Sequence, residues 1–162
     1  MNSLSSRWER LSHRGYDADT MAAIANPIGL LTLKATSEET SGKMTAIDVV
    51  AEPGNGPPLH LHQREDEFIL FLEGAFEVQL AERRFEAAPG EFVFIPRRTP
   101  HTWRAAGEAP GRFFAGFNPA SPGFEELFLR YAELPAADAG PEAMARLVTE
   151  TRAFEVLGPP LG

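Results

Sequence analysis

Three of the four histidines in this chain lie in two short segments, and these residues are the best suited to chemistry. His60 and His62 stand two residues apart, so on a β-strand their imidazoles share a face and can converge on one ion. Glu67 follows a short charged run that suits a bend, and it can add a carboxylate. The rigid turn at 96–100 then introduces His101 as a fourth, long-range ligand. This pattern predicts a site for one divalent transition-metal ion.

The ligands of the predicted site are nitrogen and oxygen, because the chain of 162 residues contains no cysteine. Neutral imidazoles and a carboxylate suit iron, nickel, manganese, zinc and copper(II) alike, so the residues do not select one metal. The alternative is a protein that keeps the four side chains but binds its ion weakly or not at all. We assign no role to His13, which fits an ordinary hydrogen-bonded or exposed histidine.

Short β-strands must position these residues. From Ile28 onward, β-rich runs recur roughly every 8 to 12 residues between glycine, proline and acidic turns, which is typical of an antiparallel sandwich or barrel. Turns are expected at Glu73-Gly74 and Pro89-Gly90, where glycine gives the backbone the freedom to reverse. Strands are predicted over 28–35, 43–51, 58–62, 67–72, 75–80, 91–95, 100–105 and 111–118.

The hydrophobic pattern changes to a helical one after Asn118-Pro119. A helix over 121–134 is predicted, either as a lid on the barrel mouth or as a buttress outside the sheet. Its apolar positions are Phe124, Leu127, Phe128 and Tyr131. A second helix should begin at Pro141, with one side formed by Met144, Leu147, Val148 and Leu157. We therefore expect one domain with an amino-terminal arm (1–25), a barrel (26–120) and a helical segment packed on the barrel (121–162).

The segment from residue 54 to residue 74 resembles the first cupin motif. That motif reads glycine, five residues, His-x-His, four residues, glutamate, six residues and glycine. Its positions are filled by Gly54, His60, His62, Glu67 and Gly74. The resemblance implies an all-β core, a double-stranded β-helix or cupin jelly-roll barrel, with the metal held inside by the paired histidines, the glutamate and a later histidine.

The second cupin motif is matched in part. Gly90, Pro96 and His101 stand at the family's spacing, whereas Arg98 replaces its glycine and Ala105 its asparagine. Neither change removes a ligand. Because arginine at positive φ costs on the order of 1–2 kcal/mol relative to glycine, the turn at 96–100 is predicted to take a different shape.

Several side chains near the predicted ligands admit two interpretations. Trp103 shares the face of His101, and Ile69 and Phe71 share that of Glu67, so they either line an aromatic-walled pocket or form ordinary core. Arg98 and Arg104 either attract an anionic substrate or are solvated surface residues, and the second interpretation is favoured.

A closer similarity connects the chain with single-domain quercetinase-like cupins, through Gly-Pro-Pro-Leu-His-x-His at 56–62 and the Pro-His-Thr-Trp-Arg segment at 100–104. It implies a metal-dependent dioxygenase acting on a small phenolic or enolisable, quercetin-like compound, with Glu67 as both ligand and general base. A non-catalytic small-molecule-binding cupin is the alternative. A sugar isomerase or epimerase would need a more polar pocket.

Composition excludes several other classes. The formal net charge of -8 and the lack of a long basic stripe disfavour nucleic acid as a partner. The most apolar run is far shorter than the roughly 20 residues that span a bilayer, and residues 1–15 lack a secretory signal pattern. We therefore expect a cytoplasmic protein with no membrane partner. Unpaired sheet edges favour a homodimer.

Overall fold

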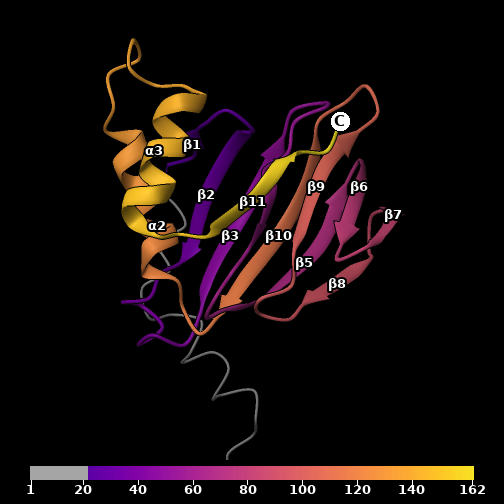
Figure 1. The fold of residues 1–162 in the computed structure, drawn as a ribbon, viewed down its shortest axis with the longest axis horizontal. Helices are drawn as coiled ribbons and strands as arrows, with labels where there is room; N and C mark the ends of the chain where they lie inside the picture. Colours follow the sequence, from indigo (N-terminus) through magenta and orange to yellow (C-terminus); the bar gives the residue numbers. More distant parts are fainter. Residues whose placement is uncertain (1–21) are drawn as a thin grey trace, which may run out of the picture.

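The computed structural model describes residues 22–162, which form two antiparallel sheets with two helices beside one of them (Figure 1). The first sheet has six strands in the order β1 (Ile24–Ala25), β2 (Gly29–Ala35), β3 (Thr45–Ala51), β10 (Gly111–Asn118), β5 (Asp66–Glu73) and β8 (Phe92–Ile95). The second has five in the order β11 (Glu155–Pro160), β4 (Pro58–Leu61), β9 (His101–Ala106), β6 (Ala75–Leu80) and β7 (Arg83–Ala87).

The chain passes back and forth between the two sheets. Strands β3, β5, β8 and β10 belong to the first sheet and β4, β6, β7 and β9 to the second, so the chain changes sheet after every strand from β3 to β10 except within the β6–β7 hairpin. This winding is the double-stranded β-helix, or jelly roll, so the predicted fold class is confirmed. All eight predicted strands are present, with ends that differ by two residues at most.

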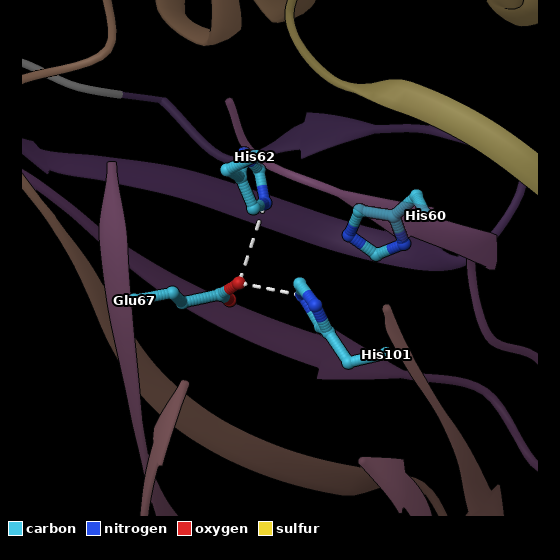
Figure 2. Close-up of side chains that lie close together, drawn as sticks. All are labelled: His60, His62, Glu67 and His101. Atoms are coloured by element: carbon cyan, nitrogen blue, oxygen red, sulfur yellow. Dashed lines mark hydrogen bonds and ion pairs between the residues drawn. The ribbon is translucent and has the colours of Figure 1, made fainter. Parts of the chain in front are cut away.

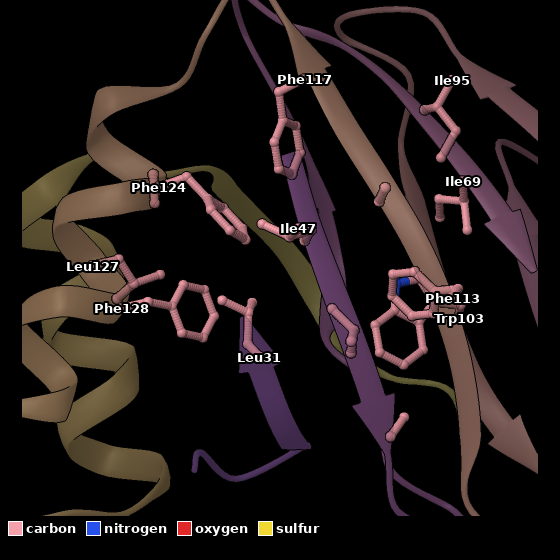
Figure 3. Packing of buried hydrophobic residues seen from close by; sticks show 14 of the residues in the cluster. Leu31, Ile47, Ile69, Ile95, Trp103, Phe113, Phe117, Phe124, Leu127 and Phe128 are labelled. Carbon is pink, nitrogen blue, oxygen red and sulfur yellow. The ribbon is translucent and has the colours of Figure 1, made fainter. Parts of the chain in front are cut away.

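The core lies between the sheets because each strand alternates inward and outward side chains. On β5 the inward positions Ile69 and Phe71 are fully buried. Phe71 packs against Phe76 and Phe113, and Trp103 meets Phe113 edge to face with ring centroids 4.8 Å apart. Figure 3 shows Trp103 and Phe113 of this group close together, with Ile69 nearby. Such aromatic pairs supply much of the buried apolar area of a small domain.

The predicted turn between β5 and β6 depends on Gly74. Its φ of 75° lies in the left-handed region, and a Cβ atom there would come within 2.9 Å of the Cα of Gly111. Only glycine tolerates both the dihedral angle and the close approach. The turn thereby delivers the chain from the first sheet to the second.

The helices α2 (Pro122–Ala132) and α3 (Pro141–Thr151) confirm the two predicted helix starts. The buried face of α2 carries the predicted apolar positions. Glu125, also buried, fixes the helix to the first sheet: its carboxylate accepts hydrogen bonds from the Ser37 backbone N–H at 2.7 Å, from the Ser37 hydroxyl at 2.8 Å and from the Thr45 hydroxyl. A fully satisfied buried carboxylate holds α2 in one position.

The placement of Leu157 on the second helix was wrong. Arg152 takes a left-handed conformation with φ 54° and ends α3, and the chain then forms β11 against β4. Prolines at the end of β11 are tolerated because it is an edge strand. The short strands β1 and β7 were also not predicted.

Two further predictions concern the ends of the chain. The predicted arm over 1–25, with His13, lies outside the described residues except for its last four positions. The predicted boundaries between arm and barrel, at 25/26, and between barrel and helical segment, at 120/121, stay a prediction. Within residues 22–162, neither helix has the length and apolar character needed to cross a bilayer.

Candidate metal centre

Four predicted residues meet inside the barrel, and they come from both sheets (Figure 2). His60 lies on β4 and His62 follows directly after it, while His101 opens β9 and is the register partner of His60. Glu67 comes from β5 in the facing sheet. All four side chains are buried, and one ligand atom from each lies within 4.8 Å of the others. The cluster could therefore hold one metal ion.

Backbone carbonyls orient two of the imidazoles. His60 Nδ1 lies 2.7 Å from the Pro58 carbonyl oxygen, and His101 Nδ1 lies 2.9 Å from that of Thr99. A carbonyl only accepts, so each Nδ1 must carry the proton and donate it. This leaves Nε2 of both rings as the unprotonated atom in the neutral form. Such carbonyl contacts are the usual support for a histidine that binds a metal through its other nitrogen.

Glu67 is the acidic centre of the cluster. Its Oε2 lies 2.9 Å from His101 Nε2 and 3.3 Å from His62 Nε2. Burial alone would raise the pKa of Glu67, but the hydrogen bond with His101 and the polar and charge interactions with His101 and His62 outweigh burial and hold the pKa well below its usual range. The carboxylate is therefore ionised at neutral pH, as a metal ligand must be.

The surroundings shift the pKa values of His60 and His101 in opposite directions. Burial, followed by the neighbouring imidazoles, lowers the pKa of His60 well below its usual value. Burial also acts to lower the pKa of His101, but the hydrogen bond to Glu67 and its charge raise the pKa overall. His60 is thus neutral and ready to coordinate at neutral pH, whereas a proton on His101 competes with a metal ion.

His62 provides a test of whether the residues fit a metal ion. Both of its ring nitrogens are buried, and neither makes a hydrogen bond with any described residue. The contact of its Nε2 with Glu67, at 3.3 Å, brings the atoms close without hydrogen-bond geometry. An unsatisfied buried polar atom costs about 1–3 kcal/mol. Coordination would give one of these nitrogens a partner, so the donor set fits a divalent transition metal.

The turn before His101 is anchored to the other ligand segments. The Arg97 backbone N–H and Nε donate to Asp66 Oδ1 at 2.9 and 3.0 Å, and Arg97 Nη2 donates to Asp66 Oδ2 at 2.9 Å. The side-chain hydrogen bond from Arg97 lowers the pKa of Asp66 to about 2. Since Asp66 adjoins Glu67, this pair fixes β5 relative to the turn that leads into His101.

The expected change of turn shape at Arg98 was wrong. Arg98, at the family's glycine position, takes the left-handed conformation itself, with φ 63°, which the expected change was meant to avoid. Its backbone N–H donates to the His62 carbonyl oxygen at 2.7 Å, and this bond offsets the cost of the dihedral angle. The exposed Arg98 and the half-buried Arg104, which pairs with Glu77, do not line the cavity.

A cavity of about 500 Å³ adjoins the cluster. Its walls come from both sheets and both helices, and Figure 3 shows Phe124, Leu127 and Phe128 of α2 facing the first sheet across it. Trp103 lines it, as one interpretation predicted, whereas Phe71 belongs to the core. The described lining residues include no lysine or arginine, and the cluster itself supplies the one carboxylate, so the cavity suits an uncharged apolar ligand.

Two aromatic residues at the cluster were missed by sequence reasoning. Phe154 lies against His60 with ring centroids 4.7 Å apart, and Phe117 lies 4.9 Å from His62. Phe117 was predictable, because it shares the inward face of β10 with Phe113. Phe154 carried no such signal, since it lies between α3 and a strand that was not predicted.

Two sheets wound into a jelly roll around a buried cluster of three histidines and one glutamate define a class of barrel proteins able to hold a metal ion. Residues 47–117 also match the family described as Cupin domain. This segment, which contains all four residues of the cluster, is a cupin domain.

The curated relatives match only part of this chain. Quercetin 2,3-dioxygenase from Bacillus subtilis (strain 168) is 32% identical over 73 residues, which cover 45% of this chain and 22% of that protein. Protein SchB from Streptomyces halstedii is 30% identical over 92 residues, covering 57% of this chain and 65% of SchB. The chain thus spans less than two thirds of the length of these relatives.

Solved structures show the same fold. KdgF from Halomonas sp. has a TM-score of 0.54 at 24% identity, over 65% of this chain and 92% of that one. An RmlC-like cupin from Shewanella frigidimarina has a TM-score of 0.57 at 18% identity, over 69% and 95% of the two chains. A Bacillus subtilis oxalate decarboxylase mutant has a TM-score of 0.55 at 22% identity, over 63% and 28%. These likenesses establish the architecture alone.

Proposed function

We propose that this cupin binds one divalent transition-metal ion through His60, His62, Glu67 and His101, and acts as a dioxygenase on a small phenolic or enolisable compound of the quercetin type. Dioxygen is the second substrate. The observation that carries the proposal is the apolar cavity of about 500 Å³ that adjoins the cluster and is lined by no described lysine or arginine. The similarity to the Bacillus protein named quercetin 2,3-dioxygenase supports the reaction class.

When bound, the metal ion would supply Lewis-acid and redox chemistry toward a substrate oxygen and dioxygen. The chain contributes the surroundings. Phe117 and Phe154 flank the histidines and keep water from the cluster. Trp103 and the apolar face of α2 give an aromatic substrate a surface to stack on.

Glu67 has the second role, as acceptor of the substrate's hydroxyl proton. It lines the cavity, and a carboxylate within hydrogen-bond reach of a hydroxyl is a competent base. The histidines now hold the pKa of Glu67 low. A substrate hydroxyl bound to a metal ion would be more acidic than a free one, so a carboxylate with a low pKa can still accept its proton.

The cavity also bears on the alternatives. A sugar or sugar phosphate needs hydrogen-bond partners or cations, and the wall offers few of either, so an isomerase or epimerase is disfavoured. A non-catalytic cupin would use the same apolar cavity. Turnover distinguishes it from the dioxygenase.

The test begins with elemental analysis of protein purified without added metal. Metal-replete protein is then assayed for oxygen uptake with neutral flavonols and phenols, and with anionic sugar phosphates as a contrasting set. We expect uptake with the neutral set only. Glu67→Gln should abolish uptake, whereas Glu86→Gln, at an exposed position on β7, should not change it. Normal flavonol binding without oxygen uptake would contradict the dioxygenase and leave the binder.

A further inference from the structure

The cavity contains a second polar region, away from the metal centre, that the proposed reaction does not use. Apart from the cluster and the Trp103 indole, the nitrogen- and oxygen-bearing side chains among the described lining residues are those of Asn26 and Asn55. Asn26 lies between β1 and β2, and Asn55 lies between β3 and β4. Both carboxamides are uncharged, so this region suits a ligand group that forms hydrogen bonds without carrying a charge.

The strand β9 separates Asn55 from the metal centre. The Gly54 N–H donates to the Ala105 carbonyl oxygen at 2.9 Å, and the Ala105 N–H donates to the Asn55 carbonyl oxygen at 3.0 Å, so the Asn55 backbone lies beside Ala105. From His101 to Ala105 the strand rises about 13 Å, at about 3.3 Å per residue. Trp103 lies midway on the same inward face and lines the cavity (Figure 3). An elongated aromatic ligand at the metal centre would therefore pass Trp103 and point its other end toward Asn55.

Two backbone carbonyls determine which way the Asn55 carboxamide faces. Its Nδ2 donates to the carbonyl oxygens of Pro27 at 3.2 Å and Ile28 at 3.3 Å. Because a carbonyl only accepts, the carboxamide nitrogen must face this turn, and Oδ1 must face away from it. The side chain is thus anchored before a ligand arrives, so little conformational entropy is lost when Oδ1 binds one.

Asn55 Oδ1 is an acceptor without a partner in the described part of the chain. The described side-chain atoms that are both sealed from solvent and unpaired are the ring nitrogens of His62 alone, so Oδ1 is accessible. Asn26 differs, because both ends of its carboxamide are used in its own turn. Its Nδ2 donates to the Ile24 carbonyl oxygen at 3.1 Å, and its Oδ1 accepts from the Ile28 N–H at 3.0 Å. Of the two asparagines, Asn55 is therefore the one whose oxygen can bind a ligand.

We propose that Asn55 determines specificity by accepting a hydrogen bond from an uncharged hydroxyl at the end of the substrate opposite the metal centre. This inference rests on the proposed function, which places the other end of the substrate at the metal. A carboxamide oxygen only accepts, so it favours a hydroxyl over an ether or an ionised carboxylate, neither of which has a proton to donate. The substrate class narrows to elongated aromatic compounds with a metal-binding oxygen at one end and a hydroxyl at the other.

Equilibrium binding to metal-replete protein tests the proposal with three flavonols that share the same metal-binding end. The first carries a hydroxyl on its outer phenyl ring, the second lacks this hydroxyl, and the third carries it as a methyl ether. The wild type should bind the first about 2–10-fold more tightly than the other two, which is the contribution of one neutral hydrogen bond.

Asn55→Leu removes the acceptor at similar volume and should abolish this preference, by weakening the binding of the hydroxyl compound alone. A purely structural role, through the bonds to Pro27 and Ile28, would weaken the binding of all three compounds equally and leave the preference unchanged. Met144→Leu is the control, because it changes an apolar lining residue of α3 at similar volume and should keep the preference. Thermal unfolding verifies that both variants are folded.

The wild-type series decides should Asn55→Leu fail to fold. A wild type that binds all three flavonols equally, or a folded Asn55→Leu protein that retains the preference, would overturn the proposal. Oxygen uptake is recorded separately. A preference without uptake would support the role of Asn55 and contradict the dioxygenase, whereas uptake without a preference would contradict the role of Asn55 alone.

Discussion

Replacing His62 by leucine should make the metal-free protein more stable and at the same time reduce its response to metal. Both ring nitrogens of His62 are buried and lack a hydrogen-bonding partner among residues 22–162, so each contributes an unfavourable desolvation term to folding. Leucine has a similar volume and no polar atom. The substitution therefore removes that penalty together with one predicted ligand.

The size of the effect follows from these contacts. Two unsatisfied nitrogens cost about 1–3 kcal/mol each, and the lost ring contact with Phe117 returns about 0.5–1.5 kcal/mol. The two nitrogens together cost about 2–6 kcal/mol, so after the lost ring contact we expect a net gain of roughly 0.5–5.5 kcal/mol for metal-free His62→Leu. For a chain of this size, each 1 kcal/mol raises Tm by about 2–4 °C. The metal-induced stabilisation that His62→Leu should reduce is of similar size, because an ion present at 100 times its Kd stabilises the wild type by about 2.7 kcal/mol.

Thermal unfolding in chelator and in added metal measures both effects. His60→Leu is the matched control, because it also removes a predicted ligand but breaks the bond of Nδ1 to the Pro58 carbonyl, so its metal-free form should not gain stability. A metal-free His62→Leu protein with a Tm below that of the wild type would refute the desolvation argument. An unchanged metal-induced shift would refute His62 as a ligand.

Three other predictions concern the supports of the site. Asp66→Asn weakens the ion pair with Arg97 in the turn before His101, and competition titration should show a metal affinity lowered by about 10–100-fold. Asp138→Asn, at an exposed position between α2 and α3, is the control and should leave the affinity unchanged. Because folding raises the pKa of His101, its protonation stabilises the metal-free fold at pH values below the pKa of the unfolded chain, and this stabilisation is lost as the pH rises through the pKa of the folded protein. A metal ion binds only the neutral ring, so a lower pH also weakens metal binding. The metal-induced rise in Tm should therefore be larger at pH 8 than at pH 6. Gly56→Ala puts a Cβ 1.8 Å from a backbone oxygen of β9 and should lower stability by about 1–3 kcal/mol in chemical denaturation, while Gly140→Ala, with open space, should not.

The ligand cluster was predictable because strand geometry does most of the positioning. Alternation along β4 and the residue after it places His60 and His62 on one face, and the inward positions of β5 set Glu67 opposite them. His101 followed from its motif spacing. Strand alternation and motif spacing were therefore enough to predict from the sequence that these four side chains lie together.

Other features depended on tertiary contacts that local rules do not encode. At Arg98 the dihedral preference of arginine predicted a different turn, but the hydrogen bond to the His62 carbonyl outweighs that preference. At 155–160 the helical spacing of Leu157 was accidental, and pairing with β4 decides the conformation. The extent of the cavity could not be predicted either, because it depends on how closely α2 approaches the first sheet.

The pairing of β11 with β4 has a consequence for biosynthesis. Glu155 is the register partner of Leu61, and Phe154 covers His60, so the wall beside the cluster is supplied by a segment made long after the residues it shields. A growing chain can assemble β4, β5, β9 and β10 while this side stays open to water. Until β11 pairs with β4, the cluster therefore lacks the part of its wall that Phe154 provides.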